Sequence, residues 1–373
     1  MKLTIDRAAL HAALRLVGRA ANKGSTLPVL ANVLLVAEQG RLRLRATNLD
    51  ITLMTSVEAS VEVEGGVTVS AAMVTDIVGR MPDGPLTLTL DEKSLTLTVL
   101  ARRRRATVRG LAADQFPPAP FVNGTTITLP AGPLREAIAQ TIVAAARNDV
   151  REVLNGICWQ ASGSILRLSG ADGFRLAMAS LPWPGDEFQV IIPAKTMNEL
   201  LRLIDKAVET VDIVAQPQRV MFRVGDVEMV TQTINGTAPD YQRLIPPAPA
   251  VCVETNAAEL AEAVRLGYLY KQLVDNETYI YATLAMGTDD AVLSVAGREL
   301  EEGQADAQVD ATLAGQEFKV TLNSRYLLDT LEVMPTGRVV IGSNGPATPA
   351  RVTPVGRDDV VHVIMPMHEA RRR

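Results

Sequence analysis

The 373-residue sequence contains few of the residues from which most reactive centres are built. It has two cysteines, Cys158 and Cys252, and three histidines, His11, His362 and His368. Two cysteines are too few for a disulfide framework or a thiolate metal site, and we expect both to lie in cores. The histidines have no acidic or thiol partner at catalytic spacing. The sequence therefore predicts no catalytic residue, no metal and no cofactor.

Aromatic residues are also scarce, and long apolar runs are missing. Tyr, Trp and Phe together make up 4% of the chain, which argues against the base-stacking platforms that hold single-stranded nucleic acid. No apolar stretch approaches the length of a membrane span, and the N-terminal residues Met1–Arg7 lack the apolar region of a secretory signal. We therefore expect a cytoplasmic protein. Its 47% of hydrophobic residues is enough for several cores of ordinary domain size.

One pattern does occur, and it occurs three times. Apolar residues with helical spacing follow a short apolar strand at Leu10, Ala13 and Leu14, at Leu134, Ala137 and Ile138, and at Leu260, Ala263 and Val264. A second helix is expected after Ser70, Pro193 and Asn323, and an alternating strand recurs at 42–44, 166–168 and 293–295. Each repeat is thus predicted to run strands, helix, strands, helix, strands, so the chain is an array of three whole domains.

Two similar proline segments mark the domain boundaries. Phe116–Pro120 and Ile245–Pro249 should be extended surface connectors, because proline fixes φ and lacks the N–H that a sheet needs. Helix starts agree, since Asp6 can cap the first helix and Asn256 can cap the helix of the third repeat. We expect α+β domains over residues 1–120, 121–249 and 250–373.

Charge is distributed unevenly although the net charge is only −5. Arg7, His11, Arg15 and Arg19 recur every four residues and so share one face of the first predicted helix. Such a face is either a solvated surface or a local surface for phosphate groups. The sparse aromatics indicate that any nucleic acid contact is to the duplex backbone, which is salt-sensitive and does not read sequence.

Four local strings resemble the bacterial DNA polymerase III beta subunit family. They are Ala171–Leu176, Ala238–Pro246, Asp149–Gly156 and Val363–Met367, and they occur in the family's order and spacing across the whole chain. The resemblance implies three tandem DNA-clamp domains per subunit and two subunits joined head to tail into a closed ring with helices lining the hole. It implies a non-catalytic accessory subunit of a DNA-directed DNA polymerase. Such a sliding clamp encircles duplex DNA without sequence specificity and tethers polymerases, the clamp loader and repair proteins.

The resemblance also implies site residues. Positions that match the family's duplex-facing residues are Lys23, Gly24, Arg147, Asn148, Arg151, Lys195 and Arg202. The helix-face argument adds Arg7, Arg15 and Arg80.

A partner pocket between the second and third domains is implied as well, and it accepts short apolar peptides. Its expected lining is Leu154, Ala171, Gly173, Phe174, Arg175, Leu176, Pro239, Arg243, Leu244, Tyr279, Asn323, Tyr326, Val363, Met365, Pro366 and Met367. Arg175 and Asn323 are expected to hold polar groups of the peptide. Ala171 and Phe174 depart from the family, which usually has Thr at the first position and often a polar residue at the second.

The dimer interface is expected at the basic run Arg102–Arg105, which could otherwise protect an exposed strand edge. Strand alternation would point Arg103 and Arg105 to one side, toward Glu299, Glu301 and Glu302 of the partner subunit's third domain. Two alternatives stay open. One is a specialised clamp paralogue that serves an accessory or repair polymerase, and the other is a repeat-built protein-interaction scaffold without DNA linkage.

Overall fold

The computed structural model describes residues 1–22, 24–268, 272–274, 277–279, 281–288, 291–299 and 303–367. The chain forms two compact units. The first unit contains Met1–Leu129 and Ala207–Thr233, and the second contains Pro130–Lys206 and Ile234–Arg373. Among the described residues, no helix is both long and apolar enough to cross a membrane.

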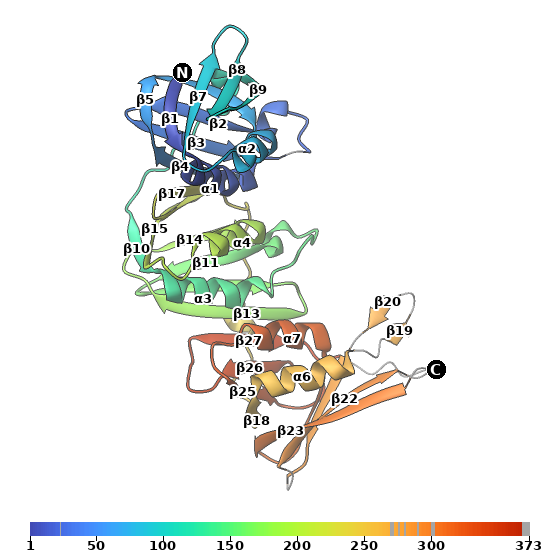
Figure 1. Cartoon of the computed structure of the whole chain (residues 1–373). Coiled ribbons are helices and arrows are strands. Elements are labelled where there is room, and N and C mark those ends of the chain that lie inside the picture. The colour runs from blue at the N-terminus through green and yellow to red at the C-terminus, as the bar shows by residue number, and fades with distance from the viewer. Residues whose placement is uncertain are drawn as a thin grey trace. The chain divides into compact units, whose positions relative to one another are not determined.

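The first unit is built on one antiparallel sheet with α1 and α2 side by side against it (Figure 1). The strands follow the order β10-β15-β16-β17-β4-β3-β2-β6-β9-β8-β7-β1-β5. Its elements are β1 (Lys2–Asp6), α1 (Arg7–Val17), the 3-10 turns η1 (Gly18–Ala20) and η2 (Pro28–Ala31), β2 (Asn32–Glu38), β3 (Arg41–Thr47), β4 (Ile51–Glu58), β5 (Ser60–Val63), β6 (Gly65–Ser70), α2 (Ala71–Arg80), β7 (Pro85–Asp91), β8 (Thr96–Ala101), β9 (Arg104–Ala112), η3 (Ala113–Gln115), β10 (Ile127–Pro130), β15 (Thr210–Gln216), β16 (Arg219–Val224) and β17 (Val227–Gln232).

The second unit has a sheet with the order β14-β11-β12-β13-β27-β26-β25-β18-β23-β22-β21-β24. The helix pairs α3–α4 and α6–α7 pack against its strands. Its elements are α3 (Ala131–Ile142), η4 (Glu152–Asn155), β11 (Gly156–Ser162), β12 (Ile165–Ala171), β13 (Arg175–Pro182), β14 (Phe188–Pro193), α4 (Ala194–Leu203), α5 (Tyr241–Leu244), β18 (Val251–Asn256), α6 (Ala257–Gly267), β19 (Gln272–Val274), β20 (Glu277–Tyr279), β21 (Tyr281–Met286), β22 (Val292–Glu299), β23 (Gly303–Ala314), β24 (Phe318–Asn323), α7 (Ser324–Glu332), β25 (Arg338–Ser343), β26 (Ala350–Pro354) and β27 (Val360–Ile364).

The predicted threefold repeat of elements is confirmed. β1–β9, β10–β17 and β18–β27 each run strand, helix, strands, helix, three strands. The apolar residues that define the repeat are buried, as Leu10, Leu134 and Leu260 illustrate with 0% exposure. The predicted caps also form, because the Asp6 carboxylate accepts from the Ala9 amide at 2.9 Å and the Asn256 side chain accepts from the first-turn amides of α6.

Both sheets contain a junction between strands of different repeats. In the first unit β17, the last strand of the second repeat, pairs antiparallel with β4, the third strand after α1. In the second unit β27, the last strand of the third repeat, pairs in the same way with β13, the third strand after α3. The last strand of one repeat thus covers an edge of the preceding repeat, and that edge is not left to pair with other chains.

A buried polar network reinforces the β13–β27 junction. His362 on β27 is 2% exposed, and its Nε2 donates to Oε1 of Gln140 on α3 at 2.8 Å. The Gln140 amide nitrogen donates to the Val333 carbonyl at the end of α7, which fixes the amide so that its oxygen accepts. The Thr330 hydroxyl lies 3.4 Å from Nδ1 of His362. The neutral imidazole is therefore held on both sides, and burial together with the Arg175 charge lowers its pKa to about 3.

We expect His362 to make folding pH-dependent. The unfolded chain takes up a proton at this residue near its ordinary pKa of about 6.5, whereas the folded protein does so only near pH 3. The free energy of unfolding should therefore fall as pH falls below about 6.5, by up to about 2 kcal/mol between pH 7 and pH 5. His362→Gln keeps a donor toward Gln140 and removes this titration. Urea unfolding of both proteins at these two pH values should show the larger loss in the wild type, and equal losses would contradict the assignment.

Candidate functional site

A cleft of about 510 Å3 lies within the second unit, between elements of the second and third repeats. One wall is the loop 145–149 that follows α3, and a second is the turn 172–175 between β12 and β13. Tyr268 at the end of α6 and the first residues of α7 complete it. Four predicted pocket residues line this cleft, namely Phe174, Arg175, Asn323 and Tyr326, and so do Arg147 and Asn148, which were predicted to face DNA.

Arg175 is held inside the chain by three interactions. Its Nε lies 3.0 Å from Asp172 Oδ2, its Nη1 lies 2.7 Å from Asp329 Oδ2 on α7, and its guanidinium stacks 4.3 Å from the centre of the Tyr326 ring. The side chain is 10% exposed. Burial, with the nearby Asp172 carboxylate, raises the pKa of Tyr326. Sequence reasoning expected Arg175 to hold the peptide, whereas its hydrogen bonds go to the two walls that form the cleft.

The turn that carries Phe174 is set by local backbone geometry. Asp172 Oδ1 accepts from the amides of Phe174 and Arg175, at 2.9 and 3.0 Å. Gly173 has φ +91°, and a Cβ there would lie 3.2 Å from Nη2 of Arg151. A side chain at this position would meet both a strained backbone and the guanidinium, which explains the glycine.

The apolar pocket residues divide into a buried group and an exposed rim. Leu154, Ala171, Leu176 and Val363 are each at most 6% exposed, and the last three belong to one hydrophobic cluster with Tyr241. The rim consists of Phe174, Leu244 and Met365, which are 63%, 56% and 46% exposed, and of the exposed Pro239 and Arg243.

Backbone hydrogen bonds fix the C-terminal part of this rim. The Met365 amide donates to the Phe174 carbonyl at 2.8 Å, which places these two side chains at adjacent backbone positions. Pro366 forms an isolated bridge with Leu322 on β24, and the Met367 amide donates to the Thr321 carbonyl at 2.8 Å. The Val363–Met367 segment is therefore tied both to the turn 172–175 and to β24.

The predicted DNA-facing residues lie in different environments. Arg15, Gly24, Arg80, Arg147, Asn148, Arg151, Lys195 and Arg202 are exposed. Arg202 is paired with Glu199 on α4. The Arg151 guanidinium binds both oxygens of Asp149 at 3.0 and 2.9 Å, and these hydrogen bonds lower the pKa of that carboxyl to about 2. Lys23 lies outside the described residues.

Arg7 has a structural role that sequence reasoning missed. Its Nε and Nη2 donate to the carbonyls of Val78 and Gly79 at the end of α2, and Nη1 lies 3.3 Å from Asp83. A cation is favoured at a helix C-terminus, where carbonyls lack partners. Arg7 thus fastens α1 to α2, and its guanidinium is not free for phosphate.

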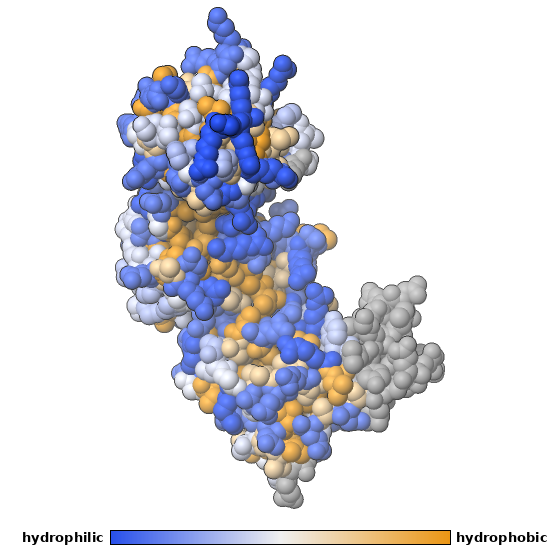
Figure 2. All heavy atoms as spheres, viewed as in Figure 1, coloured by the Kyte–Doolittle hydropathy of each residue, from blue (hydrophilic) through white to orange (hydrophobic). Residues whose placement is uncertain are grey.

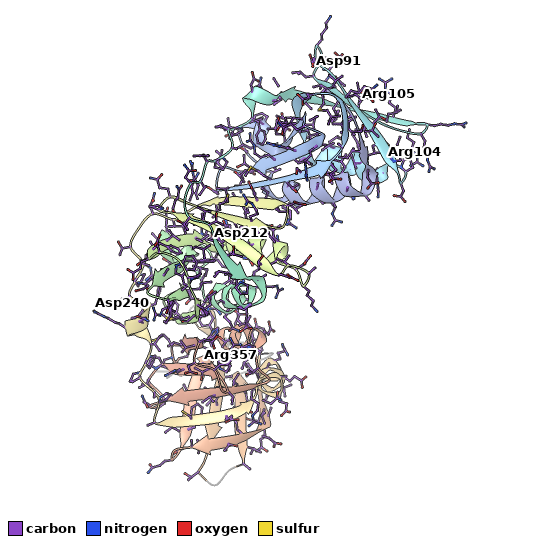
Figure 3. All side chains as sticks on the ribbon, turned by 90° about the vertical axis from the view of Figure 1, so that its left-hand side faces the viewer. Asp91, Arg104, Arg105, Asp212, Asp240 and Arg357 are labelled. Atoms are coloured by element: carbon purple, nitrogen blue, oxygen red, sulfur yellow. The ribbon has the colours of Figure 1, made fainter. Side chains whose placement is uncertain are left out.

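The basic run at the predicted interface is divided between a turn and a strand. Arg102, with φ +50°, and Arg103 form the turn between β8 and β9, so the predicted alternation across all four arginines is wrong. The strand begins at Arg104, whose guanidinium donates to the Arg80 carbonyl at 2.9 Å. Figure 3 shows Arg104 and Arg105 near this end of the hairpin, and in Figure 2 hydrophilic side chains dominate the surface around it.

Several predicted residues cannot be placed, and others were missed. The side chains of Tyr279 and Glu299, together with Glu301 and Glu302, lie outside the described residues. Sequence reasoning missed Tyr268 and Asp329 at the cleft. The spacing of Tyr326 and Asp329 on one helix was a usable signal, because residues three apart share a face. The described residues contain no cluster of His, Cys, Asp and Glu that could hold a metal ion.

Comparisons with known proteins cover the whole chain. Family models for the N-terminal, central and C-terminal domains of the DNA polymerase III beta subunit match residues 1–120, 128–240 and 242–368. The beta sliding clamp of Pseudomonas putida is 33% identical over 98% of this chain and 100% of that protein. The beta sliding clamp of Synechocystis sp. is 30% identical over 98% of this chain and 99% of that protein.

Solved structures agree with these matches. The crystal structure of the DNA polymerase III subunit beta from Pseudomonas aeruginosa has a TM-score of 0.91 at 31% identity and covers 99% of this chain and 100% of that one. The fold of three clamp domains, the family models and the full-length relatives lead to one assignment. The chain belongs to the DNA polymerase III beta subunit family.

Proposed function

We propose that this protein is a sliding clamp, the non-catalytic processivity factor of a DNA polymerase. Two copies close head to tail into a ring that encircles duplex DNA, and partner proteins are tethered through the peptide site. Membership of the beta clamp family over the full chain is the observation that carries this proposal. We place the domains at 1–120, 121–249 and 250–373, and the protein in the cytoplasm with the DNA it serves.

We propose that the ring stays on DNA because it encloses the duplex, and that its cations attract the phosphates only weakly. Exposed cations on the helices and adjacent loops can contact phosphates without reading bases. The cations that we retain are Arg15, Lys23, Arg80, Arg147, Arg151, Lys195 and Arg202, and we retain Gly24 and Asn148 as uncharged positions beside them. Arg151 and Arg202 already pair with carboxylates of the chain, so the attraction to each phosphate is weak and allows sliding.

The way in which strands of neighbouring repeats pair indicates which sheet edges meet when two subunits close the ring. The last strand of the second repeat covers β4, and that of the third repeat covers β13. The last strand of the first repeat is β9. In the third repeat the strand equivalent to β4 and β13 is β23, which is the third strand after α6 when the separate β19–β20 hairpin is left out. Residues 104–109 of β9 pair only with β8, and residues 303–310 of β23 pair only with β22, among the strands that the structure describes. We propose that these two edges pair between subunits.

Charges on the two edges are complementary. Arg105 and Arg109 are exposed on β9, while Asp306 and Asp310 are exposed on β23. In each strand the residues at the alternating positions, 106 and 108 on β9 and 307 and 309 on β23, are more buried, so the charged residues share the outer face of their sheet. Antiparallel pairing would then set arginine opposite aspartate. The turn residue Arg103 is proposed to meet Glu299, Glu301 and Glu302 of the partner at the same seam.

Charge reversal should test this closure. Arg105→Glu with Arg109→Glu should convert the dimer to a monomer at low concentration in sedimentation velocity, because like charges would face each other. Asp306→Lys with Asp310→Lys should do the same. An equimolar mixture of the two variants should recover the dimer, because one seam would pair the new glutamates with the new lysines and the other would keep the wild-type charges. Arg219→Glu on β16, an exposed arginine outside both edges, is the matched control. Dimers that persist in both double variants at high dilution would refute the seam.

Retention on DNA tests the proposed function itself. After loading by its clamp loader, the protein should remain on nicked circular DNA through gel filtration at about 0.5 M salt, where charge contacts alone are lost. It should leave the same DNA after one restriction cut, because a ring can slide off an end. Equal retention on circular and linear DNA would exclude topological linkage, and no retention on either would favour a scaffold without DNA linkage.

A further inference from the structure

The first unit contains a hollow of about 410 Å3 at the end of the ladder that joins β4 to β17. Residues of the segment 47–52, of the proline connector 117–121, and of β16 and β17 line it. The Gln232 amide donates to the Asp50 carbonyl at 2.9 Å, one residue beyond the ladder. Met365 and Phe174 form the same bond at the end of the ladder in the second unit. The hollow therefore occupies, in the first unit, the place equivalent to the proposed peptide site.

Leu49, at the rim of this hollow, is exposed and has a strained backbone. Its φ is +79°, a left-handed conformation that is rare for leucine, and its side chain is 48% exposed. Asn48 Oδ1 holds the turn by accepting from the amides of Asp50 and Ile51, at 3.0 and 2.8 Å. The Gln232 side chain donates to the Leu49 carbonyl at 2.8 Å. The turn thus keeps an apolar side chain in solvent, and backbone strain of this kind concentrates at binding sites.

The hollow also contains a guanidinium whose charge the chain leaves unpaired. Arg45 on β3 is half-buried, its Nη2 donates to the Pro117 carbonyl at 2.7 Å, and its guanidinium lies 5.2 Å from the centre of the Phe116 ring. Its Nε is buried without a hydrogen-bond partner, and burial lowers the pKa of the guanidinium. No carboxylate in the described part of the chain forms an ion pair with it. A charge removed from water in this way favours a bound counterion.

The rest of the lining combines one more cation with an apolar wall. Arg219 on β16 is exposed and likewise forms no ion pair with a described residue, whereas Asp50 is the one carboxylate among the lining residues. Phe121 is 74% exposed, and Pro118 and Pro120 precede it in the connector. Because proline fixes φ, this wall loses little conformational freedom when a ligand binds.

We propose that this hollow is a second docking site, for an acidic segment of a partner protein. A carboxylate of the segment lies between Arg45 and Arg219, and a neighbouring apolar side chain packs on Phe121 and Leu49. The site is separate from the peptide site of the second unit and goes beyond the proposed tethering function. One subunit can thus hold two segments at once, either of one partner or of two.

An acidic peptide fits the hollow better than a nucleic acid strand does. A strand carries a charge at every nucleotide, and Asp50 would oppose a continuous run of phosphates. A single carboxylate can lie between the two arginines, and the proline connector then offers its apolar wall to the next side chain of the peptide.

Phage display on the full-length protein tests the second site. Clones selected on the wild type from a random-dodecapeptide library are sorted by their binding to two variants. Phe174→Asp removes an exposed apolar side chain of the peptide site, and Arg219→Gln removes one cation of the hollow. One class of clones should bind Phe174→Asp as well as the wild type and lose binding to Arg219→Gln. These clones should carry an aspartate or glutamate beside an apolar residue.

Fluorescence anisotropy of one such peptide gives the size of the effect. Its affinity should fall about three- to tenfold for Arg219→Gln and for Phe121→Ser, and the loss due to Arg219→Gln should shrink as salt rises. Arg223→Gln, four residues along the same strand and outside this lining, is the matched control and should bind as the wild type does. Because Arg45 also holds the connector, the two surface variants carry the test.

Absence of clones that bind independently of Phe174 would overturn the proposal, as would equal affinities for the wild type, Arg219→Gln and Phe121→Ser. Weaker binding of duplex DNA by Arg219→Gln, with no loss of peptide binding, would assign the hollow to nucleic acid. The ring function is judged separately by retention on circular DNA. That retention should be the same for Arg219→Gln and the wild type, because Arg219 lies outside both proposed seam edges.

Discussion

Backbone pairing between strands of different repeats is the constraint on which the rest of this structure depends. In the second unit β13 and β27 form a ladder that runs from Arg175 opposite Ile364 to Ala179 opposite Val360. The ladder closes an exposed edge, and it also determines where the proposed partner site lies. Phe174 and Met365 stand one residue beyond its end, and the Met365 amide still donates to the Phe174 carbonyl. The site is thus a direct extension of the contact that joins two repeats.

Side chains from both sides of the ladder reinforce it. Arg175 on β13 reaches Asp329 on α7, and His362 on β27 reaches Gln140 on α3. Arg357, in the loop before β27, lies 2.6 Å from Glu136 on α3 (Figure 3). A partly buried charge is costly unless its partner is present, so the loss of one member should weaken the junction more than the loss of an isolated surface pair would. The proposed partner site and the junction therefore share residues.

The sequence revealed the architecture well, because the architecture is periodic and local. Leu10, Leu134 and Leu260 marked equivalent helices, and Asp6 and Asn256 marked their starts by short-range capping. The roles of individual charges were harder to predict. Arg7 binds carbonyls 71 and 72 residues away, and Arg175 binds a carboxylate 154 residues away. Such partners are set by packing between elements and leave no local signal. The turn at Arg102 and Arg103 was missed for a local reason. In a run of four arginines, nothing in the sequence marks the residue at which the strand begins.

We propose that the pairing of strands between repeats continues between two chains until the sheet edges are closed. Two copies with three repeats each should then form a ring. Negative-stain electron microscopy of the purified protein tests this most directly. We expect closed particles with a central hole wide enough for duplex DNA and two-fold symmetric class averages. Single open arcs at concentrations where the protein is a dimer in solution, or compact particles without a hole, would contradict it.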